Sequence, residues 1–292
     1  MSSRSKQLNI IITNSFQNDF IEPLEDLIKA QEGDSLKLDY EACQEKWMEY
    51  FGSQGRTVDD ATINQFITWL KSNTTSSTIE GPLSYHEILE KFKHRVHLNY
   101  NETKRIWGNG SLNQFINDLM NKAKQANENE LSDIEYQLIH LRDWHDQTDT
   151  TQRGELDNFG IHCLKGTHGS KFASPLNELI EKNKEFNIVL NSNNISSFDE
   201  TNLESILDTL LKNTGNSKRS VNIGIFGVVT NVKIQIITFE LKVINKFKNV
   251  YVCEDFCGGF NNEGHIAGIN LMKNIFRANV VDQNEFKSIF GI

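Results

Sequence analysis

The 292-residue sequence has little of what marks several large protein classes. With only three prolines it has no proline-rich linker, and no apolar run approaches the ~20 residues that a membrane-spanning helix needs. Residues 1–7 do not resemble a signal peptide. The four cysteines are scattered, without the spacing of a disulfide framework or a zinc ribbon (Cys43, Cys163, Cys253, Cys257). We therefore expect reduced thiols and a cytoplasmic protein.

Positive charge is also scarce. The formal net charge is −9, and no block of lysine or arginine stands out. This balance argues against partners held mainly by electrostatic attraction, namely nucleic acids and anionic membranes. The partners left by this argument are a small-molecule ligand or another protein.

Short apolar runs alternate with helical patterns, which predicts a parallel sheet built from βαβ units. The runs are apolar nearly throughout, as strands covered on both faces should be. Six strands are predicted, at 8–14, 136–142, 186–191, 221–226, 249–254 and 278–281.

Amphipathic helices separate these runs, and they are predicted over 200–212, 230–246, 265–278 and 285–290. Thr201 is a candidate helix cap, with Glu204 at capping-box spacing. The pattern predicts a three-layer α/β/α domain with a six-stranded, mostly parallel, Rossmann-like sheet.

Residues 25–135 interrupt the alternation of strands and helices. They separate the first two predicted strands by far more residues than one crossover helix requires. Helical patterns are predicted there over 40–51, 59–71 and 111–124. We interpret the chain as a single domain over 1–292 with a helical insertion at 25–135, which caps a pocket or binds a protein partner.

Polar segments follow the predicted strands, where an open α/β sheet binds its ligands. They are Asn14-Ser15-Phe16-Gln17-Asn18-Asp19-Phe20, Arg142-Asp143-Trp144-His145, His162-Cys163-Leu164-Lys165-Gly166-Thr167-His168-Gly169, Ser196-Ser197-Phe198-Asp199-Glu200-Thr201-Asn202-Leu203 and Gly227-Val228-Val229-Thr230-Asn231-Val232-Lys233. In this order they resemble the isochorismatase-like cysteine hydrolases, which include nicotinamidases. The matching family motifs are D-x-Q-N-D-F, R-D-W-H, H-C-x-x-G-T-x-G, S-A-F-x-G-T-D-L and G-x-x-T-D-x-C. The resemblance covers residues 7–23 and roughly 136–290, and it implies dimers or tetramers.

The resemblance implies a catalytic aspartate, lysine and cysteine, and this sequence has none of them in place. The aspartate position is Ser15, the lysine position is Asn191 or Ser192, and the cysteine position is Lys233. A serine hydroxyl does not ionise near neutral pH, so it is no general base. Lys233 could be a nucleophile only if burial lowered its pKa by several units from ~10.4.

A buried Lys233 would need an opposite charge or hydrogen-bond acceptors nearby, and Asn14, Ser15, Asn191 and Asn231 could supply the acceptors. That arrangement would make a cationic pocket for a carboxylate or phosphate. The alternative is that Lys233 extends to solvent from a pocket without a function.

A metal-binding set is complete. The resemblance implies that Asp143, His145 and His162 hold a divalent ion, and these ligand types suit zinc, manganese or iron. Asp143 and His145 are two residues apart and share one face of an extended segment. The alternative is that these side chains are structural.

Further residues are expected around a ligand. Asn14, Gln17 and Trp144 lie at predicted strand ends, and Val229 and Thr230 belong to a turn that resembles the family's oxyanion hole. In the family a non-proline cis peptide commonly lies in this turn, here between Val228 and Val229. Cys163 is expected to be a packing residue rather than a displaced nucleophile.

Two hypotheses about function remain. The first is a catalytically degenerate member that binds a ligand or serves as a scaffold. The second is a hydrolase acting on an amide or similar small molecule, in which a metal at Asp143, His145 and His162 activates water and Lys233 polarises the substrate. Loss of the three catalytic positions favours the first.

Overall fold

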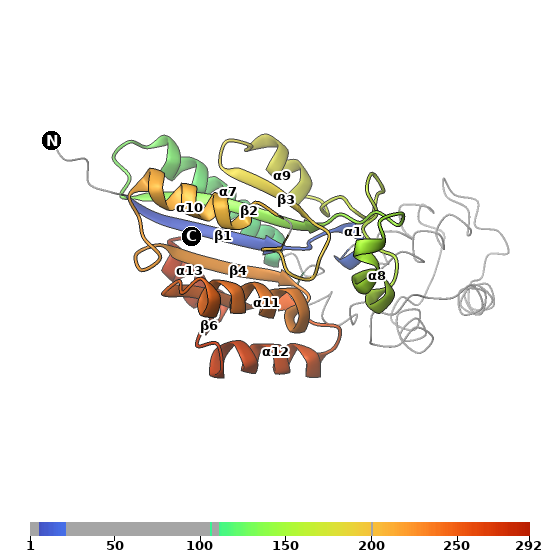
Figure 1. Ribbon diagram of the computed structural model, residues 1–292. Coiled ribbons are helices and arrows are strands. Elements are labelled where there is room, and N and C mark those ends of the chain that lie inside the picture. Colours follow the sequence, from blue (N-terminus) through green and yellow to red (C-terminus); the bar gives the residue numbers. More distant parts are fainter. Residues whose placement is uncertain (1–5, 22–105, 107–110, 200) are drawn as a thin grey trace, which may run out of the picture.

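The structure is a computed structural model that describes residues 6–21, 106, 111–199 and 201–292, and its centre is a parallel six-stranded sheet (Figure 1). The strand order is β3-β2-β1-β4-β5-β6. The strands are β1 (Gln7–Asn14), β2 (Ile134–Asp143), β3 (Asn187–Ser192), β4 (Asn222–Val228), β5 (Asn249–Gly258) and β6 (Asn279–Val281). The six predicted strands and the parallel sheet are confirmed, and β5 continues beyond its predicted end at Glu254.

The central strands β1 and β4 are buried along almost their whole length. Every residue of β1 after Gln7 is buried, and so is every residue of β4 after Asn222. Strands covered on both faces show no apolar–polar alternation, which is why their sequences read as continuous apolar runs.

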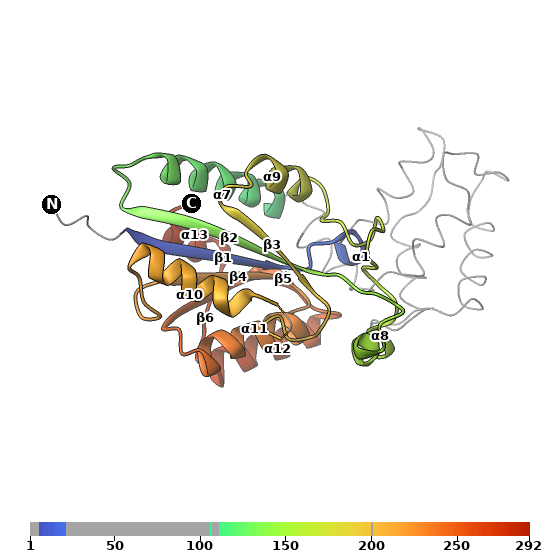
Figure 2. The same cartoon turned by 45° about the horizontal axis from the view of Figure 1, so that its top comes forward.

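Helices cover both faces of the sheet (Figure 2). One face carries α7 (Ser111–Glu128), α9 (Leu176–Lys182) and α13 (Gln283–Phe290). The other carries α10 (Leu203–Thr214), α11 (Gln235–Phe239) and α12 (Asn262–Asn274). The predicted three-layer architecture is thereby confirmed. The short helices α1 (Asn18–Ile21) and α8 (Arg153–Phe159) lie at the carboxyl ends of the strands.

Helix α7 confirms and extends the pattern predicted over 111–124. It buries Leu112, Phe115 and Ile116, and the Phe115 ring contacts the rings of Phe226 on β4 and Phe286 on α13. The last part of the predicted 25–135 insertion is therefore a layer of the α/β domain. The helices predicted over 40–51 and 59–71 lie outside the described residues.

The helix predicted over 230–246 is a continuous helical stretch from Thr230 to Ile244, with α11 at its centre. Its two ends, Thr230–Ile234 and Glu240–Ile244, are π-helical. Such segments are rare and occur often at functional sites. The first of them carries Lys233.

The predicted cap at Thr201 lies one residue before the N-cap position of the helix, but its hydroxyl does cap the first helical amide. Helix α10 begins at Leu203, and its N-cap position is Asn202. The Thr201 hydroxyl accepts from the Leu203 amide at 3.1 Å and donates to the Ser197 carbonyl at 2.5 Å, so it joins the first turn of the helix to the loop before it.

The strand order reverses between β1 and β4, and such a switch point opens a crevice at the carboxyl ends of the strands. The polar segments that follow β1, β2 and β4 begin at this end of the sheet. In the described part of the chain, no helix is both long and apolar enough for a bilayer crossing.

Candidate functional site

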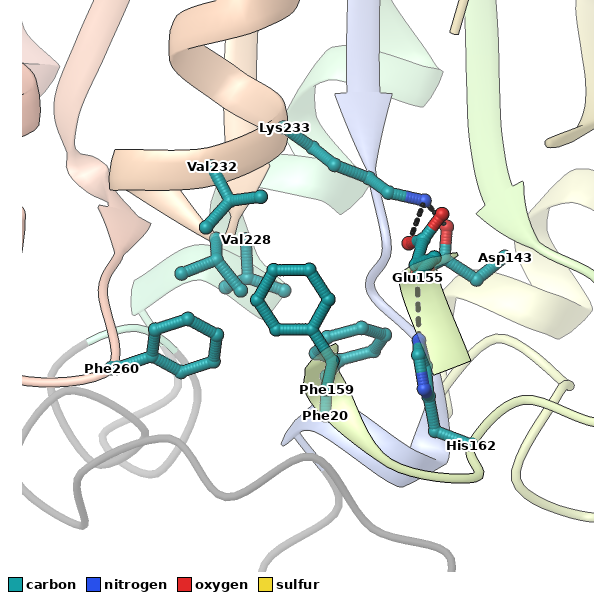
Figure 3. Close-up of a pocket in the computed structure, with 10 residues that line it drawn as sticks. Phe20, Asp143, Glu155, Phe159, His162, Val228, Val232, Lys233 and Phe260 are labelled. Atoms are coloured by element: carbon teal, nitrogen blue, oxygen red, sulfur yellow. Dashed lines mark hydrogen bonds and ion pairs between the residues drawn. The ribbon is translucent and has the colours of Figure 1, made fainter. Parts of the chain in front are cut away.

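A small pocket opens at the carboxyl end of the sheet (Figure 3). Its empty volume is about 260 Å³, including space open to solvent. Apolar side chains gather on one side and charged or polar ones on the other. The lining residues are Phe20, Asp143, Glu155, Phe159, His162, Val228, Val229, Val232, Lys233 and Phe260.

Strand β2 and the residue pair after it supply two of the polar groups. Asp143 ends β2, and His145 follows in extended backbone that bridges to Leu164. Gln17 holds the Asp143 backbone at both ends: its side-chain oxygen accepts from the Asp143 amide at 2.7 Å, and its nitrogen donates to the Asp143 carbonyl at 2.8 Å. Gln17, predicted to bind ligand, therefore positions Asp143 and does not line the pocket.

Two buried histidines present the same ring nitrogen to the site. His162 Nδ1 lies 2.7 Å from the Gly160 carbonyl, and His145 Nδ1 lies 3.3 Å from the Gln152 side-chain oxygen. Because an oxygen without hydrogen can only accept, each Nδ1 carries the proton. In the neutral rings the Nε2 lone pairs are thus left facing Asp143 and Glu155.

Lys233 reaches this cluster from the π-helical segment after β4. Its Nζ donates to Asp143 Oδ1 and lies 3.0 Å from Glu155 Oε1 on α8. Figure 3 shows the side chain extended across the pocket to the two carboxylates. Lys233 is only 4% exposed. The predicted need of a buried Lys233 for an opposite charge is met by these carboxylates, whereas the predicted amide and hydroxyl acceptors are wrong. The alternative, in which Lys233 extends to solvent, is also wrong.

The charges of the cluster stabilise one another. Burial alone would lower the pKa of Lys233, but Asp143 and Glu155 outweigh it and raise that pKa above its usual value. Burial likewise opposes ionisation of Asp143, yet Lys233 and His162 bring the Asp143 pKa below its usual range. Burial raises the pKa of Glu155 against the attraction of Lys233. The pocket is therefore not cationic as predicted, because the ammonium charge is already paired.

The pKa values of the two histidines in the cluster are shifted in opposite directions. Burial lowers the pKa of His145 to about 4, so its ring is neutral near pH 7. For His162, burial is outweighed by Asp143, whose Oδ2 lies 3.6 Å from its Nε2, and the pKa is raised.

The site contains no activated nucleophile among these groups. The raised pKa of Lys233 keeps its nitrogen protonated and without a lone pair. Cys163 is fully buried, and burial raises the pKa of its thiol well above the usual value. Reactive cysteines have lowered values and are accessible. Cys163 is thus a packing residue, as expected.

The turn after β4 has the backbone form expected of it. The Val228–Val229 peptide bond is cis. The Asn14 side chain donates to the Val228 carbonyl at 2.5 Å and to Ser15 Oγ at 2.8 Å. Gly227 has φ +142° and approaches Asn14 so closely that a Cβ would lie 2.3 Å from the Asn14 carbonyl oxygen. Asn14 therefore holds this turn.

The other predicted residues do not line the pocket, Val229 excepted. Ser15 is buried with φ +52° and accepts from Asn14. Asn191 is exposed and accepts from Arg142, and its strand neighbour Ser192 pairs in register with Asp143. Ser15, Asn191 and Lys233 are thus not gathered in one pocket.

Two further predicted ligand contacts are engaged elsewhere. The Arg142 guanidinium stacks on the Trp144 ring, with its central carbon 4.1 Å from the centre of the ring. The Thr230 hydroxyl lies 2.9 Å from His265 Nδ1.

Glu155 is the functional residue that sequence reasoning missed. It is 6% exposed and belongs to no motif of the resemblance. One signal was available: Phe159 follows Glu155 by one helical turn, so both point from α8 to the same side. That spacing is common, and it becomes informative only once α8 is placed over the pocket.

The donor types fit a divalent cation. One atom each from Asp143, His145, Glu155 and His162 lie within 4.8 Å of one another. Asp143 Oδ2, His145 Nε2 and Glu155 Oε2 are buried without a hydrogen-bond partner. Unsatisfied buried atoms of this kind indicate a missing partner. The structure thus contains a cluster that could bind a metal, although Lys233 contacts two of its carboxylates.

Several solved structures are similar to the chain. A nicotinamidase/pyrazinamidase from Bacillus subtilis has a TM-score of 0.52 and 15% identity, covering 94% of this chain and 100% of that chain. The pyrazinamidase of Pyrococcus horikoshii in complex with zinc has a TM-score of 0.48 and 14% identity, covering 94% and 98%. N-carbamoylsarcosine amidase from Thermoplasma acidophilum has 0.45 and 11%, covering 94% and 96%. At 15% identity the likeness to the Bacillus subtilis protein shows the fold alone.

Sequence comparisons add the family. No curated protein matches the chain. The family model described as Isochorismatase domain matches residues 102–285, which is more than half of the chain. With the parallel sheet and the cis turn after β4 already described, this match shows that the chain belongs to the isochorismatase family of hydrolase-fold proteins.

Proposed function

We propose that this protein binds a small molecule at the carboxyl end of its sheet without the thiol chemistry of its family. The observation that carries the proposal is the buried Lys233 ammonium, paired with Asp143 and Glu155. The family resemblance assigns the nucleophile to this position. A protonated amine bound to two carboxylates has no lone pair with which to attack a substrate.

The pocket favours a small, uncharged ligand that is flat on one side. Phe20, Phe159 and Phe260 supply aromatic surface, while His162 and the paired charges supply the polar side. Because the Lys233 charge is balanced inside the protein, a free carboxylate or phosphate gains little there. A ring with an amide substituent, such as nicotinamide, combines the two kinds of surface and is the first probe to test.

The test measures binding and turnover in the same samples. We expect nicotinamide to bind, as seen by ligand-observed NMR, and to be recovered unchanged after long incubation. Val232→Phe should abolish binding, because Val232 lines the pocket and the larger ring fills it. Val243→Phe is the matched control, since Val243 lies in the same helical stretch and is 42% exposed.

Two results would contradict the proposal. One is hydrolysis of nicotinamide, pyrazinamide or isochorismate that Lys233→Ala removes. The other is a covalent adduct found by mass spectrometry on Cys163 or Lys233. The ligand-binding part of the proposal would be contradicted if none of the three compounds bound and the NMR signals of the compounds were the same with Val232→Phe as with Val243→Phe.

A second candidate function is a metal-assisted hydrolase for an amide or similar small molecule. The unpartnered atoms of Asp143, His145 and Glu155 favour it. A divalent ion there would supply Lewis-acid polarisation of a carbonyl group. This candidate requires turnover that a chelator abolishes.

A further inference from the structure

The metal-type cluster and the Lys233 ammonium occupy the same small volume. Lys233 Nζ contacts Asp143 Oδ1 and lies 3.0 Å from Glu155 Oε1, and both carboxylates belong to the four-residue cluster. All five side chains are buried. An ion bound by these carboxylates would therefore lie close to the ammonium.

The cluster needs a positive charge. Two carboxylates in a buried site are costly without a cation, whichever cation it is. Lys233 is the one lysine or arginine that contacts them among the described residues. The ammonium also has the chemistry of a substitute ion, because it binds one oxygen of each carboxylate, while His145 Nε2 is left without a hydrogen-bond partner.

We propose that Lys233 is a tethered cation that takes the place of a divalent metal ion in the Asp143–His145–Glu155–His162 cluster. The ammonium and a metal ion exclude each other, because they compete for the same two carboxylate groups, Asp143 and Glu155, and their positive charges repel at this short distance. The natural protein therefore needs no metal ion to neutralise these two carboxylates. Its four-residue donor set is a latent metal site that removal of the ammonium uncovers.

The proposal does not rest on the ligand or activity of the pocket, so its test reads metal binding directly. Chelator-treated natural protein and Lys233→Met are titrated with zinc against a chromogenic chelator, and with cobalt, whose visible spectrum reports its coordination. Methionine retains much of the length of the side chain and removes the charge. Lys165→Met is the matched control, because Lys165 also pairs with a carboxylate, Asp146, but is half exposed and outside the cluster.

We expect Lys233→Met to bind one zinc ion at least roughly 10–100-fold more tightly than the natural protein, the range known for changes next to metal ligands. Lys165→Met should match the natural protein. Adding His162→Ala to Lys233→Met should return zinc affinity towards the natural level. Bound cobalt in Lys233→Met should show the intense visible bands of a site with few ligands.

The proposal falls if the natural protein binds one zinc ion as tightly as Lys233→Met does. It also falls if the Lys233→Met gain persists with His162→Ala, since the metal would then lie elsewhere. Should Lys233→Met fold poorly, the double variant Lys233→Met/Glu155→Gln removes one carboxylate charge and keeps Asp143, His145 and His162. The same comparison with the natural protein then decides the matter.

Discussion

Two buried histidine environments lie on or next to β2, and they differ in how completely their nitrogens are used. His140, inside the sheet, has Nδ1 2.7 Å from Thr13 Oγ1 and Nε2 2.7 Å from Asn187 Oδ1. His145, just beyond the strand, uses Nδ1 only and leaves Nε2 unpartnered beside Glu155. Burial lowers both pKa values to about 4.

The difference separates a polar group with a full set of partners from one in a candidate binding site. At His140 every hydrogen-bonding atom is satisfied by the sheet, so the residue needs no ligand. Around His145 several atoms stay open and a charged lysine fills the centre. Burial and a shifted pKa are common to both places, and unsatisfied atoms distinguish the site.

The largest expected effect comes from removing the cation at the centre of the cluster. Lys233→Ala leaves Asp143 and Glu155 buried without their partner, which should cost about 3–5 kcal/mol in the free energy of unfolding. Urea denaturation at pH 7 measures it. Lys165→Ala, in an exposed pair, should change little. Equal effects of the two substitutions would show that the buried cluster has no special electrostatic role.

The second prediction concerns pH and His140. Its pKa is about 4 in the folded protein and about 6.5 when unfolded, so folding favours the neutral ring. The resulting stability is complete above pH 6.5 and is lost as the pH falls towards 4. The loss attributable to His140 should be about 2 kcal/mol between pH 7 and pH 5.

The measurement compares the natural protein with His140→Gln by urea unfolding at both pH values. The variant should be less stable at pH 7 and lose less stability on acidification than the natural protein. An unchanged pH dependence would show that His140 accepts a proton inside the sheet.

A smaller effect is expected at Gln17, which holds the Asp143 backbone. Gln17→Leu removes hydrogen bonds to the Asp143 amide and carbonyl and to the Ser170 carbonyl, and it should cost about 1–3 kcal/mol. The pocket should also bind ligand less well, because Asp143 loses its support. Gln137→Leu, on the half-buried side of β2, is the control for stability. Similar losses in both variants would mean that Gln17 has no positioning role.

Much of the sheet could be predicted from the sequence. The run 8–12 is apolar apart from Asn9, and its length and its neighbours in the sequence predict a buried parallel strand. Asp143 and His145 could be placed on one side of an extended segment because alternation in β structure is a local property. Helix ends were harder, as Thr201 shows, since competing hydrogen bonds within a turn decide them.

The site could be predicted only in part. The sequence motifs pointed to Asp143, His145 and His162, and these residues do meet. The partners of Lys233 could not be found, because Asp143 is 90 positions away and Glu155 belongs to a helix without a motif. Asn191 was a plausible partner of Lys233 by its position in the sequence. It is exposed, however, and it pairs with Arg142, the residue before Asp143, and accepts a hydrogen bond from it.

What the sequence by itself determined was therefore local: strand and helix periodicity, the polar segments after each strand, and the cation that stands at position 233. Which charges face that cation was decided by the tertiary structure. Side-chain contacts depend on how β2, α8 and the π-helical segment after β4 converge at one end of the sheet. The pairing that makes Lys233 a buried counter-ion arises from that convergence, because electrostatic interactions depend on distance in space and not on separation along the chain.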